Sequence, residues 1–386
     1  MQKKSKANNK IDKTRTKRTQ VDFVLIVIII ILLSFGIVMV LSASAPSALA
    51  ETGDSYTYVT KQAIFAILGL VAMWFFSKLD YRFYKKIYWP VYWFSVGVLL
   101  LVLIPGLGYS AGGATRWIDL GFTQFQPSEI TKIGLIIFYA GYLSDHKDEL
   151  RSFKKGFCKP IAFLLPPVAI ALFVQNHLSV GIVMAAITFV MMIMAGCRLL
   201  HFIIVGGIAG GALAGGLGIF LATAGENAAD ANFRIGRLLN YMDPWQDPTG
   251  TGWQTIQSLY AIGSGGLFGV GLGESKQKYL YVSEPQNDFI FSILAEELGF
   301  IGCVIVIILF ALFVWRGIII AMKAPDMFGS LLATGITTLV MIQVAINIGV
   351  VTNTIPNTGM SLPFFSAGGT ALVMLLRNVW NITEYL

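Results

Sequence analysis

Asp288 is the acidic residue best placed for chemistry, because it ends a polar stretch and directly precedes the apolar run FIFSILAEELGF. A carboxylate at the mouth of a membrane helix could act as a general base toward an alcohol. An Asp before an apolar run is also an ordinary helix N-cap, and spacing alone leaves both interpretations open. Glu296 and Glu297 would lie about 12 Å deeper along such a helix. Carboxylates are costly at that depth and normally face a cavity or a partner.

Other charged residues could handle an anionic head group. Glu129 and Lys132 share one face of an expected helix, where they could form a structural ion pair or line a water-filled cavity. Arg116 precedes a tryptophan and could bind pyrophosphate bidentately or simply anchor the chain at the interface. Arg234 and Arg237 form a further i, i+3 pair of cations. Together these residues predict either an enzyme or a transporter for a lipid-linked anion.

The elements that must position these residues are membrane helices. The chain has 386 residues, of which 55% are hydrophobic and 13% charged, and its mean hydropathy is +0.70. This composition excludes a soluble enzyme and a disordered chain, and it predicts an all-α integral membrane protein of about ten spans. We expect these spans at 21–43, 61–77, 87–105, 128–143, 161–175, 178–196, 200–223, 289–314, 328–353 and 363–382. The fifth and sixth should form a tight hairpin at Gln175-Asn176-His177.

The longest loop, 224–288, lies between the seventh and eighth spans and should hold much of the function. Its segment 253–268 is amphipathic, with Gln257 on the polar side, and predicts a helix lying in the membrane interface. The run Gly269-Val270-Gly271-Leu272-Gly273 has no strand before it, so a dinucleotide site is not expected there. Loop 224–288 is therefore the predicted extracellular part of the membrane domain.

Charge and cysteine patterns set the orientation and exclude other classes. The net charge is +7, and residues 1–20 form a basic tail that should lie in the cytoplasm against anionic lipid. Most Lys and Arg then fall on the cytoplasmic side, with both termini inside and 21–386 as one membrane domain. The three cysteines and three histidines have no metal-ligand spacing, and no Walker motif occurs. We expect no metal centre built by protein ligands alone, no ATP hydrolysis and no nucleic-acid partner.

Several motifs in order resemble the SEDS family, and most closely its FtsW and SpoVE branch. The resemblance covers essentially the whole chain from residue 21 onward. It departs from many relatives only at the uncharged pairs Val282-Ser283 and Ser366-Ala367. The matching motifs are Arg116-Trp117, Gln126-Pro127-Ser128-Glu129 with Lys132, Asp243-Pro244-Trp245, Gly252-Trp253-Gln254 with Gln257-Ser258, Gly269-Val270-Gly271-Leu272-Gly273, Glu284-Pro285-Gln286-Asn287-Asp288-Phe289-Ile290-Phe291 with Glu296-Glu297-Leu298-Gly299, Pro356-Asn357-Thr358-Gly359 and Leu362-Pro363-Phe364 with Gly368-Gly369.

The resemblance implies a ten-span peptidoglycan glycosyltransferase that polymerises lipid II on the outer face of the cytoplasmic membrane, with inversion at the sugar. It implies Asp288 as the catalytic residue and Glu129 and Lys132 as part of a charged cavity. No cofactor is required, although a divalent cation (Mg or Mn) could bridge the phosphates. The other residues expected to bind substrate are Arg116, Arg234, Arg237, Glu284, Glu296 and Gln257.

The family resemblance also implies partner proteins, and it leaves alternative functions open. The expected partner is a class B penicillin-binding protein transpeptidase, with divisome or spore-coat-synthesis regulators in addition. The predicted glycosyltransferase would act in septal or spore cell-wall synthesis. In septal synthesis, the protein would be enriched at the division septum. The alternatives are a lipid II flippase, a noncatalytic scaffold for the transpeptidase and a RodA-like elongation polymerase.

Overall fold

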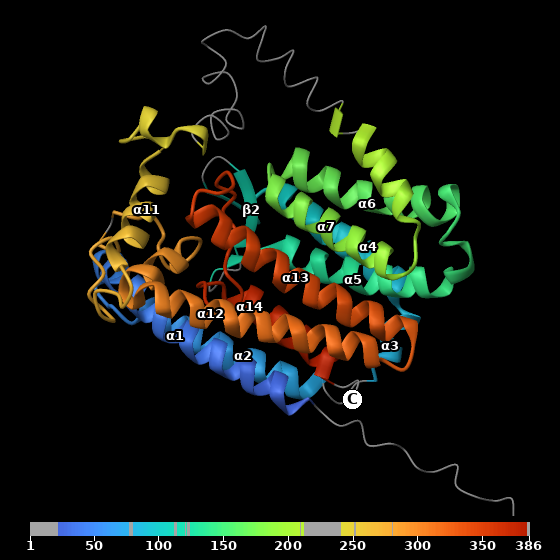
Figure 1. Cartoon of the computed structure of the whole chain (residues 1–386), viewed down its shortest axis with the longest axis horizontal. Helices are drawn as coiled ribbons and strands as arrows, with labels where there is room; N and C mark the ends of the chain where they lie inside the picture. Colours follow the sequence, from blue (N-terminus) through green and yellow to red (C-terminus); the bar gives the residue numbers. More distant parts are fainter. Residues whose placement is uncertain are drawn as a thin grey trace, which may run out of the picture.

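The computed structural model describes residues 22–76, 80–111, 114–119, 121, 124–208, 210–211, 241–250, 252–279 and 281–383. Most of these residues form helices that run side by side along one direction (Figure 1). Arg234 and Arg237, and most of the predicted seventh span, lie outside the described residues. The expected helical membrane architecture is confirmed, and five described helices are long and apolar enough to cross a membrane.

The helices and strands occur in the following order along the chain. The first half contains α1 (Phe23–Thr52), α2 (Thr57–Phe76), α3 (Arg82–Lys86), α4 (Tyr88–Leu100), the 3₁₀ turn η1 (Leu101–Leu103), β1 (Gly108–Ala111), β2 (Ala114–Asp119), β3 (Gln124–Phe125), α5 (Pro127–Asp145), the 3₁₀ turn η2 (Lys147–Glu149), the π-helical turn η3 (Phe153–Cys158), α6 (Lys159–Ala169), the π-helical turn η4 (Ile170–Val174) and α7 (Leu178–Met194). A shorter apolar helix follows at Leu199–Ile208. The second half contains the 3₁₀ turn η6 (Pro244–Gln246), α11 (Trp253–Gly265), α12 (Ile290–Lys323), α13 (Met327–Val351) and α14 (Gly369–Thr383).

The core of the bundle is built around α5, α12 and α13. Helix α5 packs against α4, α7 and α13, while α12 packs against α1, α11 and α13. The largest core side chains include Phe138, Tyr139 and Phe313, none of which is measurably exposed. By contrast, many Leu, Ile and Phe side chains at the bundle surface are exposed, as a protein surrounded by lipid requires.

The described chain begins and ends at the same end of the bundle. Asp22, just before α1, forms an ion pair with Arg316 near the last turns of α12. Helix α14 runs parallel to α2, because Gly369 lies against Phe65 and Gly69 lies against Leu376. Helix α2 itself returns from the other end after the turn at Gly53. We call the end holding Asp22 the terminal end and the opposite end the far end.

The predicted hairpin between the fifth and sixth spans is confirmed. Turn η4 ends at Val174 and α7 begins at Leu178, so only residues 175–177 connect them. The amide of Gln175 donates to the carbonyl oxygen of Leu99 over 3.1 Å, which holds the hairpin against the end of α4. Asn176 adopts a left-handed conformation (φ 48°), the backbone geometry that Asn tolerates better than most residues.

Several helix boundaries differ from those expected. Helix α1 continues to Thr52, nine residues beyond the predicted end at 43, because its polar Ser44 and Ser47 are buried against neighbouring helices. Helix α14 begins at Gly369 rather than 363. Residues before it form a compact turn in which the Ser366 hydroxyl accepts the Leu362 N–H over 2.7 Å. The left-handed Gly53 ends α1, and the hydrogen-bonded turn at 362–366 delays the start of α14, so local hydropathy alone does not set these boundaries.

A small sheet between α4 and α5 was not anticipated. Its three antiparallel strands have the order β1-β2-β3, with Tyr109 opposite Trp117 and Ile118 opposite Phe125. Only Ile118 of these four is buried, so the strands carry a weak hydrophobic signal. Such short strands are stabilised mainly by pairing with one another, which sequence periodicity does not report.

Helix α12 is interrupted at the tenth of its 34 residues. Gly299 has φ 66° and ψ −167°, which no residue of a regular helix adopts. The freed N–H groups of Phe300 and Ile301 donate to the carbonyl oxygens of Gly266 (2.9 Å) and Leu267 (3.2 Å). The loop after α11 therefore supplies the hydrogen bonds that the broken helix lacks.

The glycine-rich run 269–273 completes this arrangement. The N–H groups of Val270 and Gly271 donate to the carbonyl oxygens of Glu296 and Glu297, each over 3.0 Å. A Cβ on Gly269 would stand 2.1 Å from the Glu297 carbonyl oxygen, so no larger residue fits without a shift of backbone. Unpaired backbone groups are strongly disfavoured in a membrane, and these glycines allow the chains to approach closely enough to pair them.

Candidate active site

Asp288 is held by its backbone at the far end of the bundle. It lies just before α12 and is half-buried, and the N-cap residue of the helix is Phe289 rather than Asp288. The side-chain amide of Asn347 in α13 donates to the carbonyl oxygen of Asp288 over 2.8 Å. The same amide donates to the carbonyl oxygen of Met360 over 2.6 Å. One buried asparagine thus fastens the Asp288 segment to the loop before α14.

The loop 356–363 connects Asp288 with a second charged region. Its Gly359 lies directly beside the Asp288 carboxylate. Its Thr358 carbonyl oxygen accepts a hydrogen bond from the hydroxyl of Ser179 in α7 over 2.8 Å. Its residues 361–363 line a small, partly open cavity of about 30 Å³ together with Glu129 of α5. The two acidic positions predicted from the sequence therefore border the same short loop.

Glu129 and Lys132 form the expected pair. The Lys132 ammonium donates to a carboxylate oxygen of Glu129 over 2.7 Å, and the lysine is only 1% exposed. Apart from Glu129, the cavity is lined by uncharged residues of α5, α13, the 361–368 turn and α14, a few of them polar. A largely buried carboxylate in such a setting is stabilised mainly by its cation. The pair can thus maintain structure and also set the charge at the cavity wall.

Arg116 extends from β2 to the hairpin before α7. Its guanidinium donates to the carbonyl oxygen of Asn176 over 2.8 Å and to that of Gln175 over 3.4 Å. This clasp attaches the small sheet to the α6–α7 hairpin. A guanidinium has five N–H donors, and this clasp uses two of them.

Glu284 and Gln257 have contrasting environments. Glu284 is exposed in a left-handed turn (φ 51°), where its carboxylate accepts from the amides of Gln286 (2.9 Å) and Asn287 (3.0 Å). Partial removal from water, and secondarily the carboxylate of Glu51, raise the pKa of Glu284. Gln257 is buried in α11. The predicted amphipathic helix is thus present as α11, with Gln257 packed inward.

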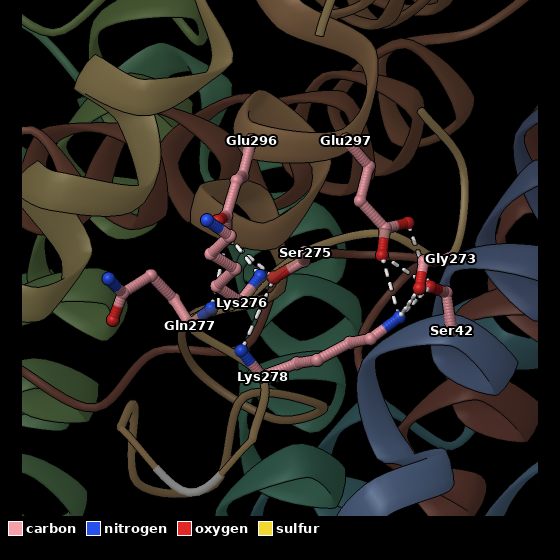
Figure 2. Close-up of polar contacts among 8 residues, drawn as sticks. All are labelled: Ser42, Gly273, Ser275, Lys276, Gln277, Lys278, Glu296 and Glu297. Carbon is pink, nitrogen blue, oxygen red and sulfur yellow. Dashed lines mark hydrogen bonds and ion pairs between the residues drawn. The ribbon is translucent and has the colours of Figure 1, made fainter. Parts of the chain in front are cut away.

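Glu296 is buried at the break in α12, and its side chain points toward the loop at residues 275–277 (Figure 2). Its carboxylate accepts hydrogen bonds from the Ser275 hydroxyl and from the N–H groups of Lys276 (3.0 Å) and Gln277 (3.3 Å). These three donors bind both of its oxygens. The sequence predicts that a carboxylate at this depth needs polar partners, and Ser275, Lys276 and Gln277 provide them for Glu296.

Two residues near the site escaped sequence reasoning, Asn347 and Lys278. An asparagine in the middle of the apolar helix α13 is a usable signal, because buried amides require specific partners. Lys278 forms an ion pair with Glu297, which comes 19 residues later in α12, a pairing that no spacing rule predicts. Among the described residues, no three His, Cys, Asp or Glu side chains converge on a metal site.

The fold and the site together define a polytopic helical membrane protein in which Asp288, at one end, lies beside the loop that borders the Glu129 cavity. The chain belongs to the family of cell cycle proteins represented by FtsW, RodA and SpoVE, which matches residues 23–382. It is 43% identical over 376 residues to stage V sporulation protein E of Bacillus subtilis (strain 168), covering 96% of this chain and 99% of that protein. The resemblance seen in the motifs is thereby confirmed.

Further relatives and solved structures agree with this family. The chain is 38% identical over 358 residues to the probable peptidoglycan glycosyltransferase FtsW of Geobacter sp. (strain M18), covering 93% and 94% of the two chains. It superposes with a TM-score of 0.74 and 28% identity on a chain from a peptidoglycan synthase complex that coordinates polymerization and crosslinking, covering 94% and 97%. The rod shape determining protein RodA of Thermus thermophilus gives a TM-score of 0.67 at 26% identity, covering 94% and 96%.

Proposed function

We propose that this protein is a peptidoglycan glycosyltransferase that polymerises lipid II into glycan strands. The observation that carries the proposal is the placement of Asp288 at the far end of the bundle, fastened by Asn347 to the loop that borders the Glu129 cavity. Relatives named as probable peptidoglycan glycosyltransferases, at 38–40% identity over nine tenths of the chain, support the same activity.

The chemistry suits a single carboxylate base. The sugar 4-hydroxyl of one lipid-linked strand attacks the anomeric carbon of the other, and undecaprenyl pyrophosphate leaves with the bonding electrons. Asp288 accepts the proton of the attacking hydroxyl, an assistance that typically contributes roughly 10²–10⁴-fold in rate. A single displacement converts an α-linked donor into a β-linked polymer. No nucleotide is needed, because the pyrophosphate linkage already carries the activation.

The departing pyrophosphate requires positive charge nearby. Arg116, Lys132, Arg234 and Arg237 are the cations we assign to this task, since preorganised charges stabilise a leaving anion. Of the other predicted substrate contacts, Glu284 is exposed and keeps this proposed role, whereas Glu296 and Gln257 are buried inside the protein. A divalent cation is not required by this chemistry, and if present it would bind chiefly through the phosphates.

The proposed topology has ten spans, with both termini in the cytoplasm and loop 224–288 outside. It is supported by the helices at the predicted positions and by the shared terminal end of α1 and α14. It places Asp288 at the outer surface of the cytoplasmic membrane, at the depth of lipid head groups. The enzyme would work with a class B penicillin-binding protein, as polymerization and crosslinking are coordinated in the related synthase complex. Division or spore-wall regulators would recruit it, at the septum in the first case.

The test is polymerisation of labelled lipid II by the purified protein with its cognate penicillin-binding protein, whose transpeptidase is inactivated. We expect glycan strands from the wild type and none from a well-folded Asp288→Asn variant. Glycan from both proteins would remove Asp288 from the role of base. Absence of glycan from both, together with lipid II translocation in liposomes, would favour a flippase instead.

A further inference from the structure

A second buried ion pair lies at the break in α12 (Figure 2). The Lys278 ammonium contacts three acceptors: a carboxylate oxygen of Glu297 at 3.0 Å, the carbonyl oxygen of Gly273 at 2.6 Å and the hydroxyl oxygen of Ser42 at 3.2 Å. The side chains of Lys278 and Glu297 are 5% and 0% exposed. An ammonium has three donors, so this lysine is fully satisfied.

Glu297 connects this pair to the first helix. The Ser42 hydroxyl in α1 lies 2.6 and 2.7 Å from the two carboxylate oxygens of Glu297. The adjacent Glu296 meanwhile holds the loop just before Lys278 through Ser275. The loop, the broken helix and α1 are therefore joined at one point by consecutive carboxylates.

The Lys278–Glu297 pair closes a loop of chain in which Asp288 is almost central. Asp288 comes ten residues after Lys278 and nine before Glu297. One arm of this loop is further held by α11, whose Trp253 indole donates to the Tyr281 carbonyl oxygen over 2.7 Å. The other arm is the first part of α12, before the break. The two chain segments that flank Asp288 are therefore joined to each other by this ion pair.

Stability alone does not explain charges at this position. Desolvating an ammonium and a carboxylate is costly, and apolar residues of similar volume often stabilise a protein equally well or better. What a hydrogen-bonded ion pair provides is one defined geometry. Displacement of a catalytic group by about 1 Å can lower a rate about 10²-fold. We therefore expect the defined geometry of this ion pair to affect the rate of catalysis more than the stability of the fold.

We propose that Lys278 and Glu297 are positioning residues, which set the location of Asp288 by closing the 278–297 loop against α1. This inference rests on the proposed function. It predicts that loss of the pair lowers kcat while KM for lipid II changes little, because the substrate cavity near Glu129 is built from other helices.

The test compares two ion pairs at opposite ends of the contact between α1 and α12. The first variant, Lys278→Met with Glu297→Gln, removes both charges at the break, while the introduced amide can still accept from Ser42. The matched control, Arg316→Met with Asp22→Asn, removes the α1–α12 pair at the terminal end. Asn can still accept the helix-capping bond that Asp22 receives from Leu25. Each double variant avoids a lone buried charge, and rates are normalised to folded protein.

We expect kcat to fall about 10- to 100-fold in the Lys278/Glu297 variant and less than about twofold in the control. Equal falls in both variants, or no fall in either, would overturn the positioning role. Hydrogen exchange of the backbone amides in 281–289 provides a readout without activity. If the wild type makes no glycan, the proposed function fails, and the exchange data still decide the inference. Loss of protection confined to the Lys278/Glu297 variant supports it, and unchanged protection overturns it.

Discussion

Gly359 stands so close to Asp288 that a Cβ on the glycine would lie 3.2 Å from the Oδ2 atom of the carboxylate. Gly359 also has φ 63°, a left-handed conformation that other residues rarely adopt. Close approach and backbone conformation therefore require glycine at the same position. The loop before α14 forms one wall around the proposed base and limits where its carboxylate can lie.

Gly359→Ala should impair catalysis more than folding. The left-handed conformation costs about 1 kcal/mol for alanine, and the new methyl group must push the Asp288 carboxylate aside. Gly53→Ala is the matched control, because Gly53 has φ 75° but no atom within 4 Å of its Cβ position. We expect similar small falls in the thermal unfolding midpoint for both, with glycan synthesis reduced several-fold only in Gly359→Ala. Equal activity of the two variants would contradict the close contact.

Asn347→Leu should separate the Asp288 segment from the loop before α14. The substitution leaves the carbonyl oxygens of Asp288 and Met360 without their shared donor, at a cost of about 1–3 kcal/mol. The measurement is thermal unfolding in detergent together with glycan synthesis, and we expect both to decline. The control in the same helix is Thr334→Val, which removes only a local bond to Ser330. Full activity of Asn347→Leu would show that this amide does not position the base.

The Glu129–Lys132 pair can be tested for structural and functional roles separately. Lys132→Met alone should destabilise the protein by about 3–5 kcal/mol, because it leaves Glu129 beside an apolar cavity without its cation. Combining it with Glu129→Gln should restore most of the unfolding free energy. If the pair serves the substrate, glycan synthesis stays low in the double variant. Recovery of stability and synthesis together would identify a purely structural pair.

Glu284 predicts a pH dependence of stability. Its pKa is raised, first by partial removal from water and then by Glu51, so the folded protein binds the proton more tightly than the unfolded chain. This contribution to stability is fully present below the ordinary pKa of a glutamate and is lost as the pH rises through the raised value. The thermal unfolding midpoint of Glu284→Gln, compared with the wild type across this pH range, should lack that component. Glu51→Gln should diminish it, and an unchanged profile in both variants would contradict the shift.

Much of the architecture follows from local sequence. A membrane helix needs a long apolar run, so hydropathy locates the membrane helices approximately, including the hairpin at residues 175–177. Charges inside such a chain are rare enough to be informative. Glu129 and Lys132 are paired as i, i+3 spacing allows, and Glu296 has the buried partners that its depth requires.

Other features depend on contacts between distant segments. Nothing local distinguishes the glycine at 299 from one inside a continuous helix. Its left-handed geometry exists because the 266–271 loop supplies the missing hydrogen bonds. The pairing of Lys278 with Glu297 and Ser42 likewise joins three separate parts of the chain.

The sequence by itself determined the helical membrane class, the position of the proposed base along the chain and the charges available to it. Only the tertiary structure decided which carboxylate lies beside the loop before α14 and which ones hold the chain together. The physical reason is range. Hydropathy and helical spacing act over a few residues, whereas desolvated carboxylates and amides take their partners from whichever segments the packed bundle brings within about 3 Å.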